Sequence, residues 1–304
     1  MKNLYIIFFV LLTIQIGAQP LDSTFATRID QNIQKMIEEN CSAPYSLVMD
    51  VQSNIAPDSL IYFLSRYDTI QNADVQEFLY ECYYEYVWKK VVDTAFKKQM
   101  ITYFLNGCNA VNPTSACRYA TECMKQLDNS LFEKIHIDTI NVRASKLTNV
   151  SLDYAYLSGK LYQRQMIPVF KQQLKEAKWD GEKYKLGLIL ARLGDEEGLA
   201  IVQKSLQELP IFDRIFTIDG VIKYVKQKQI IDVLLDDLHA NDFLPSQYPS
   251  DNPPLYAQLA LHKLTTLIYD FPIKRNLDGY TDEELEIARK WAKKHKKNYQ
   301  IIEE

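Results

Sequence analysis

Glycine and proline are scarce in this chain, with 9 and 11 among its 304 residues. Their scarcity argues against collagen-like, low-complexity and turn-dense all-β chains, and 47% hydrophobic with 24% charged residues is typical of an ordered globular protein. Neither sign of charge dominates, because 35 basic and 39 acidic residues leave a formal net charge of -4. A chain without a positive field does not attract a nucleic-acid backbone, so we expect no nucleic-acid partner.

The short motifs of catalysis and cofactor binding are missing as well. The sequence contains no GxSxG, HExxH, Walker or GxGxxG motif and no calcium loop of the EF-hand type. Acidic pairs such as Glu196-Glu197 and Asp236-Asp237 suit helix ends, where they interact with the helix dipole, better than acid–base catalysis. We therefore expect no catalytic residues, no cofactor and no metal site.

The cysteines and histidines form no metal-binding pattern either. The histidines are scattered singly, and the cysteines show no CxxC or zinc spacing. The five cysteines are Cys41, Cys82, Cys108, Cys117 and Cys123. We expect them to be apolar residues of helix faces, and the sequence leaves open one disulfide among the last three.

The N-terminus has the organisation of a secretory signal peptide. Met1 and Lys2 precede an almost unbroken apolar run at residues 4–16, which small residues follow. Crossing a bilayer as a helix takes roughly 18 to 20 apolar residues, so a retained anchor is the weaker interpretation. We predict a signal peptide at 1–18 that is cleaved between Ala18 and Gln19. Its end resembles that of exported proteins of Gram-negative bacteria, which implies a periplasmic, extracellular or cell-surface location.

A period of 32 residues organises the chain from Ser151 onward. Three rows aligned without a gap share seven wholly apolar columns, which are Tyr154/Leu186/Ile218, Leu157/Ile189/Val221, Leu161/Leu193/Val225, Ile167/Leu199/Ile231, Val169/Ile201/Val233, Phe170/Val202/Leu234 and Leu174/Leu206/Leu238. Within each row the apolar residues follow helical spacing on both sides of a short turn, which predicts a pair of helices. Because one pair cannot bury both its faces, we predict that pairs stack into an α-solenoid. An ordinary helical bundle is the alternative.

The middle row resembles a known repeat family. Residues 184–206 contain a helix, the turn Leu193-Gly194-Asp195 and a second helix with paired aliphatic residues, and they look like a HEAT-type repeat. Residues 261–298, with a Leu-Thr step and a final helix that contains Trp291, are similar to the closing unit of bacterial HEAT-like proteins. The resemblance covers residues 151–298 and implies a right-handed, curved stack of helix pairs. Tetratricopeptide repeats, which have a similar period, are the second choice.

The N-terminal half is predicted to be helical with weaker repetition. Asp, Ser and Pro residues that suit helix starts precede helices predicted at 22–39, 58–66, 74–90, 94–108 and 114–127. We divide the chain into the signal peptide, irregular helical pairs at 19–150 and HEAT-like repeats with capping helices at 151–304, the last two forming one continuous stack. Residues 240–254 contain four prolines and are predicted to form a long loop. Thr281 and Glu284 predict a capping box.

Aromatic residues crowd one segment, residues 77–88. The spacing of four residues places Tyr80, Tyr84 and Trp88 on one stripe of a helix, while Leu79, Cys82, Tyr83 and Tyr86 form another face. Both stripes can belong to the core of a stack. The alternative is that Tyr80, Tyr84 and Trp88 form an exposed ledge that stacks against a sugar or grips a peptide, and we call them the candidate ligand ledge.

Two further patterns have a structural and a functional interpretation. Residues 289–297 form a basic patch at a helix C-terminus, where cations complement the helix dipole or dock on an anionic lipid or glycan surface. Asp-Ser/Thr triplets such as Asp93-Thr94-Ala95 and Asp138-Thr139-Ile140 cap helices or resemble acceptors of bacterial O-glycosylation.

The sequence thus predicts an all-α, exported α-solenoid that works without chemistry. Its concave face would bind a protein, a peptide or a glycan. The alternative is a periplasmic or secreted glycan-active hydrolase whose site is assembled from distant carboxylates in the groove. Two acids with raised pKa values in one pocket would favour the hydrolase, and single aromatic and amide side chains would favour binding.

Overall fold

The computed structural model describes residues 23–302 apart from 68, 71, 90–92, 108–114, 147–150, 242 and 244–254. The predicted signal peptide at 1–18, its cleavage site at Ala18 and Gln19, and Cys108 lie outside the described residues. So does most of the predicted loop at 240–254. The side chain of Trp88 is also outside the description, although its backbone belongs to a helix.

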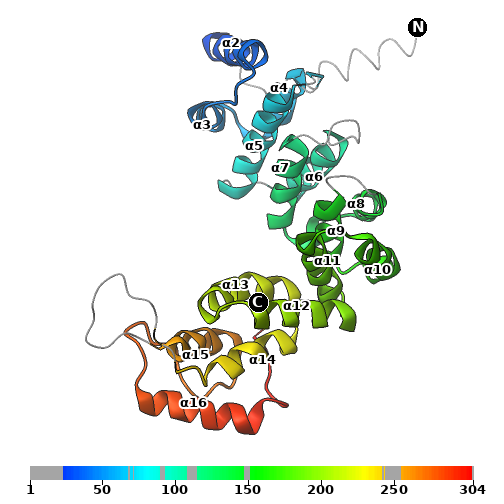
Figure 1. Cartoon of the computed structure of the whole chain (residues 1–304). Coiled ribbons are helices and arrows are strands. Elements are labelled where there is room, and N and C mark those ends of the chain that lie inside the picture. Colours follow the sequence, from blue (N-terminus) through cyan, green and yellow to red (C-terminus); the bar gives the residue numbers. More distant parts are fainter. Residues whose placement is uncertain are drawn as a thin grey trace. The chain divides into compact units, whose positions relative to one another are not determined.

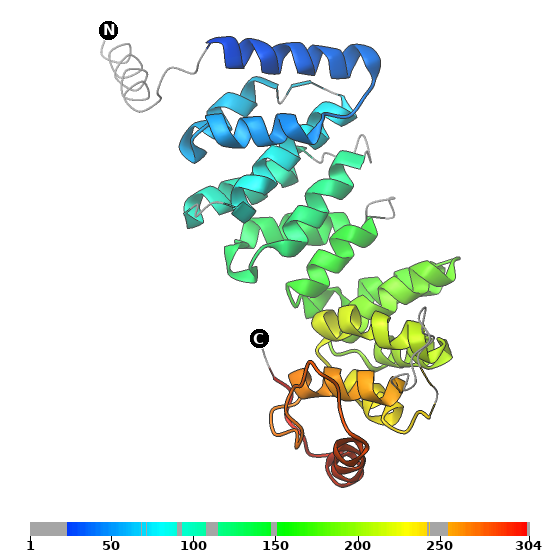
Figure 2. The same cartoon turned by 90° about the vertical axis from the view of Figure 1, so that its left-hand side faces the viewer.

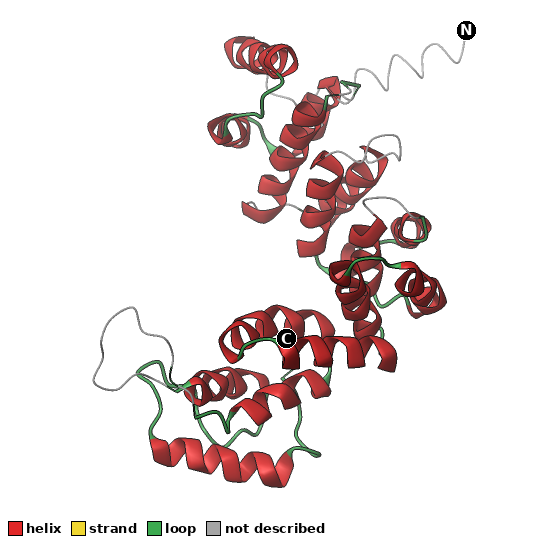
Figure 3. Cartoon of the chain, in the orientation of Figure 1, coloured by secondary structure: helices red, strands yellow, loops and turns green. Residues whose placement is uncertain are grey.

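The described part of the chain is all-α, which confirms the predicted class. It comprises fifteen α-helices and three short 3-10 helices and contains no strand, only two isolated bridges, Phe243 to Leu255 and Ile268 to Ile301 (Figure 3). Among the helices that the description covers, none is long and apolar enough to cross a membrane.

Contacts divide the chain into two compact units, Met1–Leu157 and Ser158–Glu304. The division falls within helix α9 (Ser151–Lys160), a few residues beyond the domain limit at 150/151 that the sequence predicted.

The first unit is built around helix α5 (Ala73–Lys89), which contacts α2, α3, α4, α6 and α7. The other helices of this unit are α2 (Ser23–Glu39), α3 (Tyr45–Asn54), α4 (Pro57–Leu64), η1 (Ser65–Tyr67), α6 (Thr94–Gly107), α7 (Ser115–Gln126), η2 (Asn129–Leu131) and α8 (Lys134–Ala144) (Figure 1). A helix that is apolar on several faces needs neighbours on each of them, and the aromatic run of α5 is explained by its central place. Helices α3 and α8 were not predicted from the sequence, whereas the five predicted helices all occur.

The second unit repeats one packing arrangement. Helices α11 (Asp180–Arg192), α12 (Glu196–Glu208) and α13 (Ile211–Val225) each contact the next helix and the next but one. The remaining helices are η3 (Arg164–Met166), α10 (Ile167–Glu176), α14 (Lys228–Asp237), α15 (Tyr256–Leu267) and α16 (Asp282–His295). Helix α14 contacts both α13 and α15, and α15 contacts α16, which Figures 1 and 2 show beyond α15 near the end of the chain.

The apolar columns of the three rows form most of the core along this part of the chain. Five of the seven columns are buried in all three rows, and only the columns that begin with Ile167 and Val169 are half-buried in the first two. The second helix of each row begins at the same position, with Arg164, Glu196 and Lys228 spaced 32 residues apart.

The turns between the paired helices share an unusual backbone conformation. Tyr162, Gly194 and Lys226 have φ values of 55°, 85° and 53°, and they too are spaced 32 residues apart. This left-handed conformation commonly ends a helix, and only glycine adopts it without strain. The first and third rows therefore keep the backbone of the Leu193-Gly194-Asp195 turn without its glycine.

Capping side chains fix the helix starts that the sequence indicated. Asp195 accepts hydrogen bonds from the backbone N–H groups of Glu197 (3.1 Å) and Gly198 (3.2 Å) at the start of α12. The predicted capping box is confirmed, since the Glu284 N–H donates to Thr281 Oγ1 (3.2 Å) and the Thr281 N–H donates to Glu284 Oε2 (2.8 Å). Asp93 likewise accepts from the Phe96 N–H (2.7 Å), so one of the Asp-Thr triplets serves as a cap.

Candidate functional site

The candidate ligand ledge does not present its first residue to solvent. Tyr80 is 1% exposed, and its ring packs edge-on against Tyr103 and Phe104, with ring centres 5.6 Å and 5.5 Å away. The prediction of an exposed ledge is therefore wrong for Tyr80, because α6 covers this stripe of α5. Tyr84 is half-buried, burial raises the pKa of its hydroxyl, and the side chain of Trp88 is not described.

The opposite face of α5 is buried as well. The Tyr86 hydroxyl lies within hydrogen-bonding distance of the carbonyl oxygens of Val51 (3.0 Å), Gln52 (3.2 Å) and Ile55, where helix α3 ends. Burial raises the pKa of Tyr86, so the hydroxyl remains a donor at physiological pH. This ring holds α5 against α3 and is not available to a ligand.

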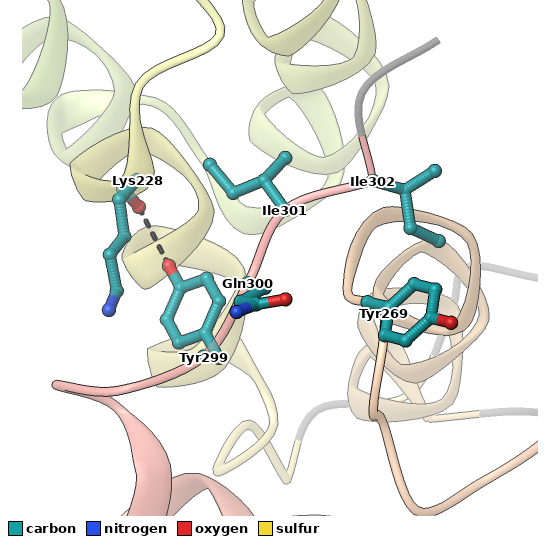
Figure 4. Close-up of a pocket in the computed structure, with 6 residues that line it drawn as sticks. All are labelled: Lys228, Tyr269, Tyr299, Gln300, Ile301 and Ile302. Carbon is teal, nitrogen blue, oxygen red and sulfur yellow. Dashed lines mark hydrogen bonds between the residues drawn. The ribbon is translucent and has the colours of Figure 1, made fainter.

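An open pocket of about 640 Å³ lies at the C-terminal end of the second unit (Figure 4). Residues from α14, from the segment after α15 and from the last residues of the chain line it: Lys228, Tyr269, Tyr299, Gln300, Ile301 and Ile302. We call it the tail pocket.

Two backbone hydrogen bonds hold the walls of the tail pocket together. The Tyr269 N–H donates to the Gln300 carbonyl (3.0 Å), and the Ile302 N–H donates to the Leu267 carbonyl (2.9 Å). The end of the chain thus pairs as an extended segment with the residues that follow α15. Trp291 supports it from α16, with its ring centre 5.0 Å from that of Phe271 and 6.4 Å from that of Tyr299.

Tyr299 is the fixed ring of the tail pocket. Its hydroxyl lies 2.9 Å from the Lys228 carbonyl and 3.0 Å from Asp232 Oδ1, and its ring centre lies 4.1 Å from Lys228 Nζ. Burial raises the pKa of Asp232, which the hydrogen bond from Tyr299 partly offsets. Burial and the neighbouring Asp232 raise the pKa of Tyr299.

Tyr269 is the open ring of the same pocket. Its side chain is 71% exposed, and Figure 4 shows it across the extended segment from Tyr299. A fixed aromatic ring, an open aromatic ring, the exposed amide of Gln300 and the ammonium group of Lys228 therefore converge on one surface. Such a set can stack on a flat apolar face and hydrogen-bond to its edge.

A second, smaller pocket of about 360 Å³ borders the basic patch. It is lined by His239, Asn241, Glu286, Arg289, Lys290 and Lys293. Arg289 is engaged within the fold, since its Nε donates to the Leu238 carbonyl (2.7 Å) and its Nη1 to Glu286 (2.6 Å), which lowers the pKa of Glu286. Lys290 and Lys293 are exposed, so the patch retains cations that can face a partner.

The remaining reactive side chains have structural surroundings. Burial raises the pKa of the Cys82 and Cys123 thiols, which keeps them protonated, and Cys41, Cys82 and Cys123 carry free thiols. His136 hydrogen-bonds Thr102 (2.8 Å), accepts from the Glu133 N–H (3.1 Å) and has its pKa lowered by burial. Among the described residues no group of His, Cys, Asp and Glu is arranged to hold a metal ion.

The tail pocket was not predicted from the sequence. Its residues come from three separate places in the chain, at 228, at 269 and at 299–302, and none of them was predicted as a site residue. The sequence signal for the pocket is the group of apolar residues Tyr299, Ile301 and Ile302 after the last helix. Such residues are expected to pack against the fold, whereas a polar segment would stay in solvent.

Comparison of the chain with protein-family models, with curated proteins and with solved structures gives no match. The resemblance to HEAT-type repeats therefore rests on the sequence patterns at residues 184–206 and 261–298.

Proposed function

We propose that this chain is an exported, non-enzymatic binding module that holds a peptide, a protein or a glycan on the tail pocket. The observation that carries the proposal is the pairing of an exposed ring, Tyr269, with a ring fixed from behind, Tyr299. Tyr269 offers the ring face on which a ligand can stack, and Tyr299, which is buried, holds the neighbouring wall of the pocket in place.

We further propose that the helices form an α-solenoid of HEAT-like pairs in the envelope of a Gram-negative bacterium. Three regularities support the repeat: the buried columns, the equal spacing of the second helices, and the left-handed residues Tyr162, Gly194 and Lys226 at the same place in each row. The apolar run at 4–16 supports export. In this proposal the basic patch at 289–297 adds a weak contact with an anionic surface.

The hydrolase alternative needs two carboxyl groups that face one ligand. Asp232 has a raised pKa, but its carboxylate lies behind Tyr299 and does not line the tail pocket. Glu286 lines the smaller pocket, where Arg289 lowers its pKa, which is the opposite of what a general acid requires. Binding is therefore the function that this geometry supports better.

The test compares Tyr269→Ala with the wild-type chain on arrays of bacterial glycans and peptides. A stacking ring contributes about 1–1.5 kcal/mol, so we expect Tyr269→Ala to lose roughly tenfold in affinity for whatever the wild type binds. Trp179→Ala is the matched control, because Trp179 is equally exposed (71%) in the same unit but does not line the pocket. Equal binding by all three proteins would rule out the tail pocket as the binding site.

A further inference from the structure

Arg192, at the end of helix α11, is a buried cation whose hydrogen-bonding groups are not used. Its side chain is 7% exposed, and its Nε and Nη1 atoms are enclosed without a hydrogen-bond partner. Nη2 is not among the enclosed atoms. Most buried guanidinium groups are paired with a carboxylate, so this arrangement is unusual and requires an explanation.

Two tyrosine rings form the surroundings of Arg192. The guanidinium carbon lies 4.0 Å from the ring centre of Tyr162 and 5.8 Å from that of Tyr224. Tyr224 fits there because residue 159 is glycine: its hydroxyl occupies the place that a Cβ atom at Gly159 would take. Cation–π attraction to the rings offsets part of the free-energy cost of burying the charge. The rings do not accept hydrogen bonds from the N–H groups, which lie in the plane of the guanidinium.

Among the residues that the structure describes, no carboxylate accepts a hydrogen bond from Arg192 Nε or Nη1. Asp195 follows at the next turn, but its carboxylate caps helix α12 and forms an ion pair with Lys171 (2.8 Å). A second guanidinium, that of Arg164, lies within 4.0 Å of the position where Gly194 would carry a Cβ atom. The described part of the fold therefore buries the Arg192 cation without supplying an anion for its Nε and Nη1 groups.

Tyr162 is placed to cover and uncover the site. It is 48% exposed and stands in the left-handed conformation, which is strained for a residue with a side chain. The same conformation recurs at Gly194 and Lys226, so the turn accounts for it, and the ring of Tyr162 lies over the Arg192 guanidinium. A rotation about the side-chain torsions of Tyr162 would open Nη1 beside Nη2, the pair of donors that grips a carboxylate in a fork.

We propose that Arg192 anchors a second binding site, separate from the tail pocket, that takes the carboxylate group of a small ligand or of a peptide. A flat carboxylate matches the fork of two coplanar N–H donors better than a tetrahedral phosphate does. Binding supplies the missing acceptors, and the cation supplies the counter-charge.

Arginine side-chain NMR of the full chain tests this proposal directly. Protein labelled with ¹⁵N-arginine is titrated with sodium acetate against sodium chloride at constant ionic strength, and Arg192→Met assigns the Nε–H resonance. We expect a saturable shift of the Arg192 Nε–H resonance with acetate that chloride does not produce, because a carboxylate on the guanidinium changes the electronic surroundings of the whole group. Arg214 is the internal control, because its guanidinium already pairs with Asp237 (2.5 Å and 3.1 Å), and its resonance should not respond.

Two further titrations identify the kind of ligand that supplies the carboxylate. A short peptide with a free C-terminus is compared with the same peptide as its C-terminal amide: a response to the free acid alone assigns a peptide terminus, and a response to acetate alone assigns a small carboxylate ligand. Tyr162→Ala should bind either ligand faster. The proposal is overturned if acetate and chloride shift the Arg192 resonance alike. The titrations use the wild-type chain, and Arg192→Lys replaces Arg192→Met for the assignment if the latter fails to fold.

Discussion

Three tyrosines of helix α5 share one environment, whereas the two tyrosines of the tail pocket differ from each other. On α5, Tyr80, Tyr83 and Tyr86 are all buried, because neighbouring helices cover both stripes. In the tail pocket Tyr299 is buried while Tyr269 is largely exposed. Periodicity thus identifies which side chains share a face, but the number of covered faces depends on helices elsewhere in the chain.

The largest effect that separates the two regions is the loss of a buried ring. Replacing Tyr80 by alanine leaves a cavity between α5 and α6, and we expect the free energy of unfolding to fall by about 3–5 kcal/mol. Tyr269→Ala removes an exposed ring and should change it by no more than about 0.5 kcal/mol. Urea unfolding followed by circular dichroism measures both. Similar losses in the two variants would show that the comparison of environments is wrong.

The helices could be predicted from the sequence because their signals are local. Capping residues and apolar spacing placed the five predicted helices of the first unit within a residue or two of their observed ends. Helix α3 was not predicted because Pro44 precedes it and no side chain caps its first turn. Helix α8 was not predicted because it is mostly polar and has few buried positions. Burial of both stripes of α5 was the leading interpretation and the exposed ledge its alternative, and only the packing of neighbouring helices such as α6 and α7 decides between them.

The candidate sites could not be predicted because they depend on contacts between distant segments. The tail pocket requires residue 269 to lie beside residue 300, and Arg192 meets rings that lie 30 residues before it and 32 after it. One sequence signal does indicate a shared turn in all three rows. Tyr162 and Lys226 occupy the column of Gly194, and a shared period implies a shared backbone even where the glycine is missing.

A smaller loss of stability is expected when either of two buried hydroxyl groups, one in each region, is removed. Tyr86→Phe removes a donor to carbonyl groups at the end of α3, of which that of Val51 also accepts from the Ile55 N–H, so we expect a loss of about 1 kcal/mol. Tyr299→Phe removes a donor to the half-buried carboxylate of Asp232, and its cost should be about 1–2 kcal/mol at neutral pH. Urea unfolding at pH 7 and at pH 3 distinguishes them.

Only the second of these losses should depend on pH. Below its pKa, Asp232 is protonated and needs the Tyr299 donor less, so the cost of Tyr299→Phe should shrink in acid while that of Tyr86→Phe stays constant. Equal pH dependence in both variants would contradict the pairing of Tyr299 with Asp232.

The smallest expected effect is the pH dependence that Asp232 itself confers. Its pKa is raised in the folded chain, chiefly by burial, so the folded state holds this proton more tightly than the unfolded state does. The associated stability is present below the ordinary aspartate pKa near 4 and is lost as the pH rises through the folded-state pKa. Asp232→Asn removes the titration and keeps an oxygen that accepts from Tyr299. The variant should therefore gain stability relative to the wild type between pH 3 and pH 7, and Asp180→Asn, at an exposed aspartate with a weak ion pair, should not. A wild-type chain that gained stability over Asp232→Asn as the pH rose would mean that Lys228 and Lys296, rather than burial, govern this carboxylate, and the tail pocket would then rest on an ion-pair network instead of a buried hydrogen bond.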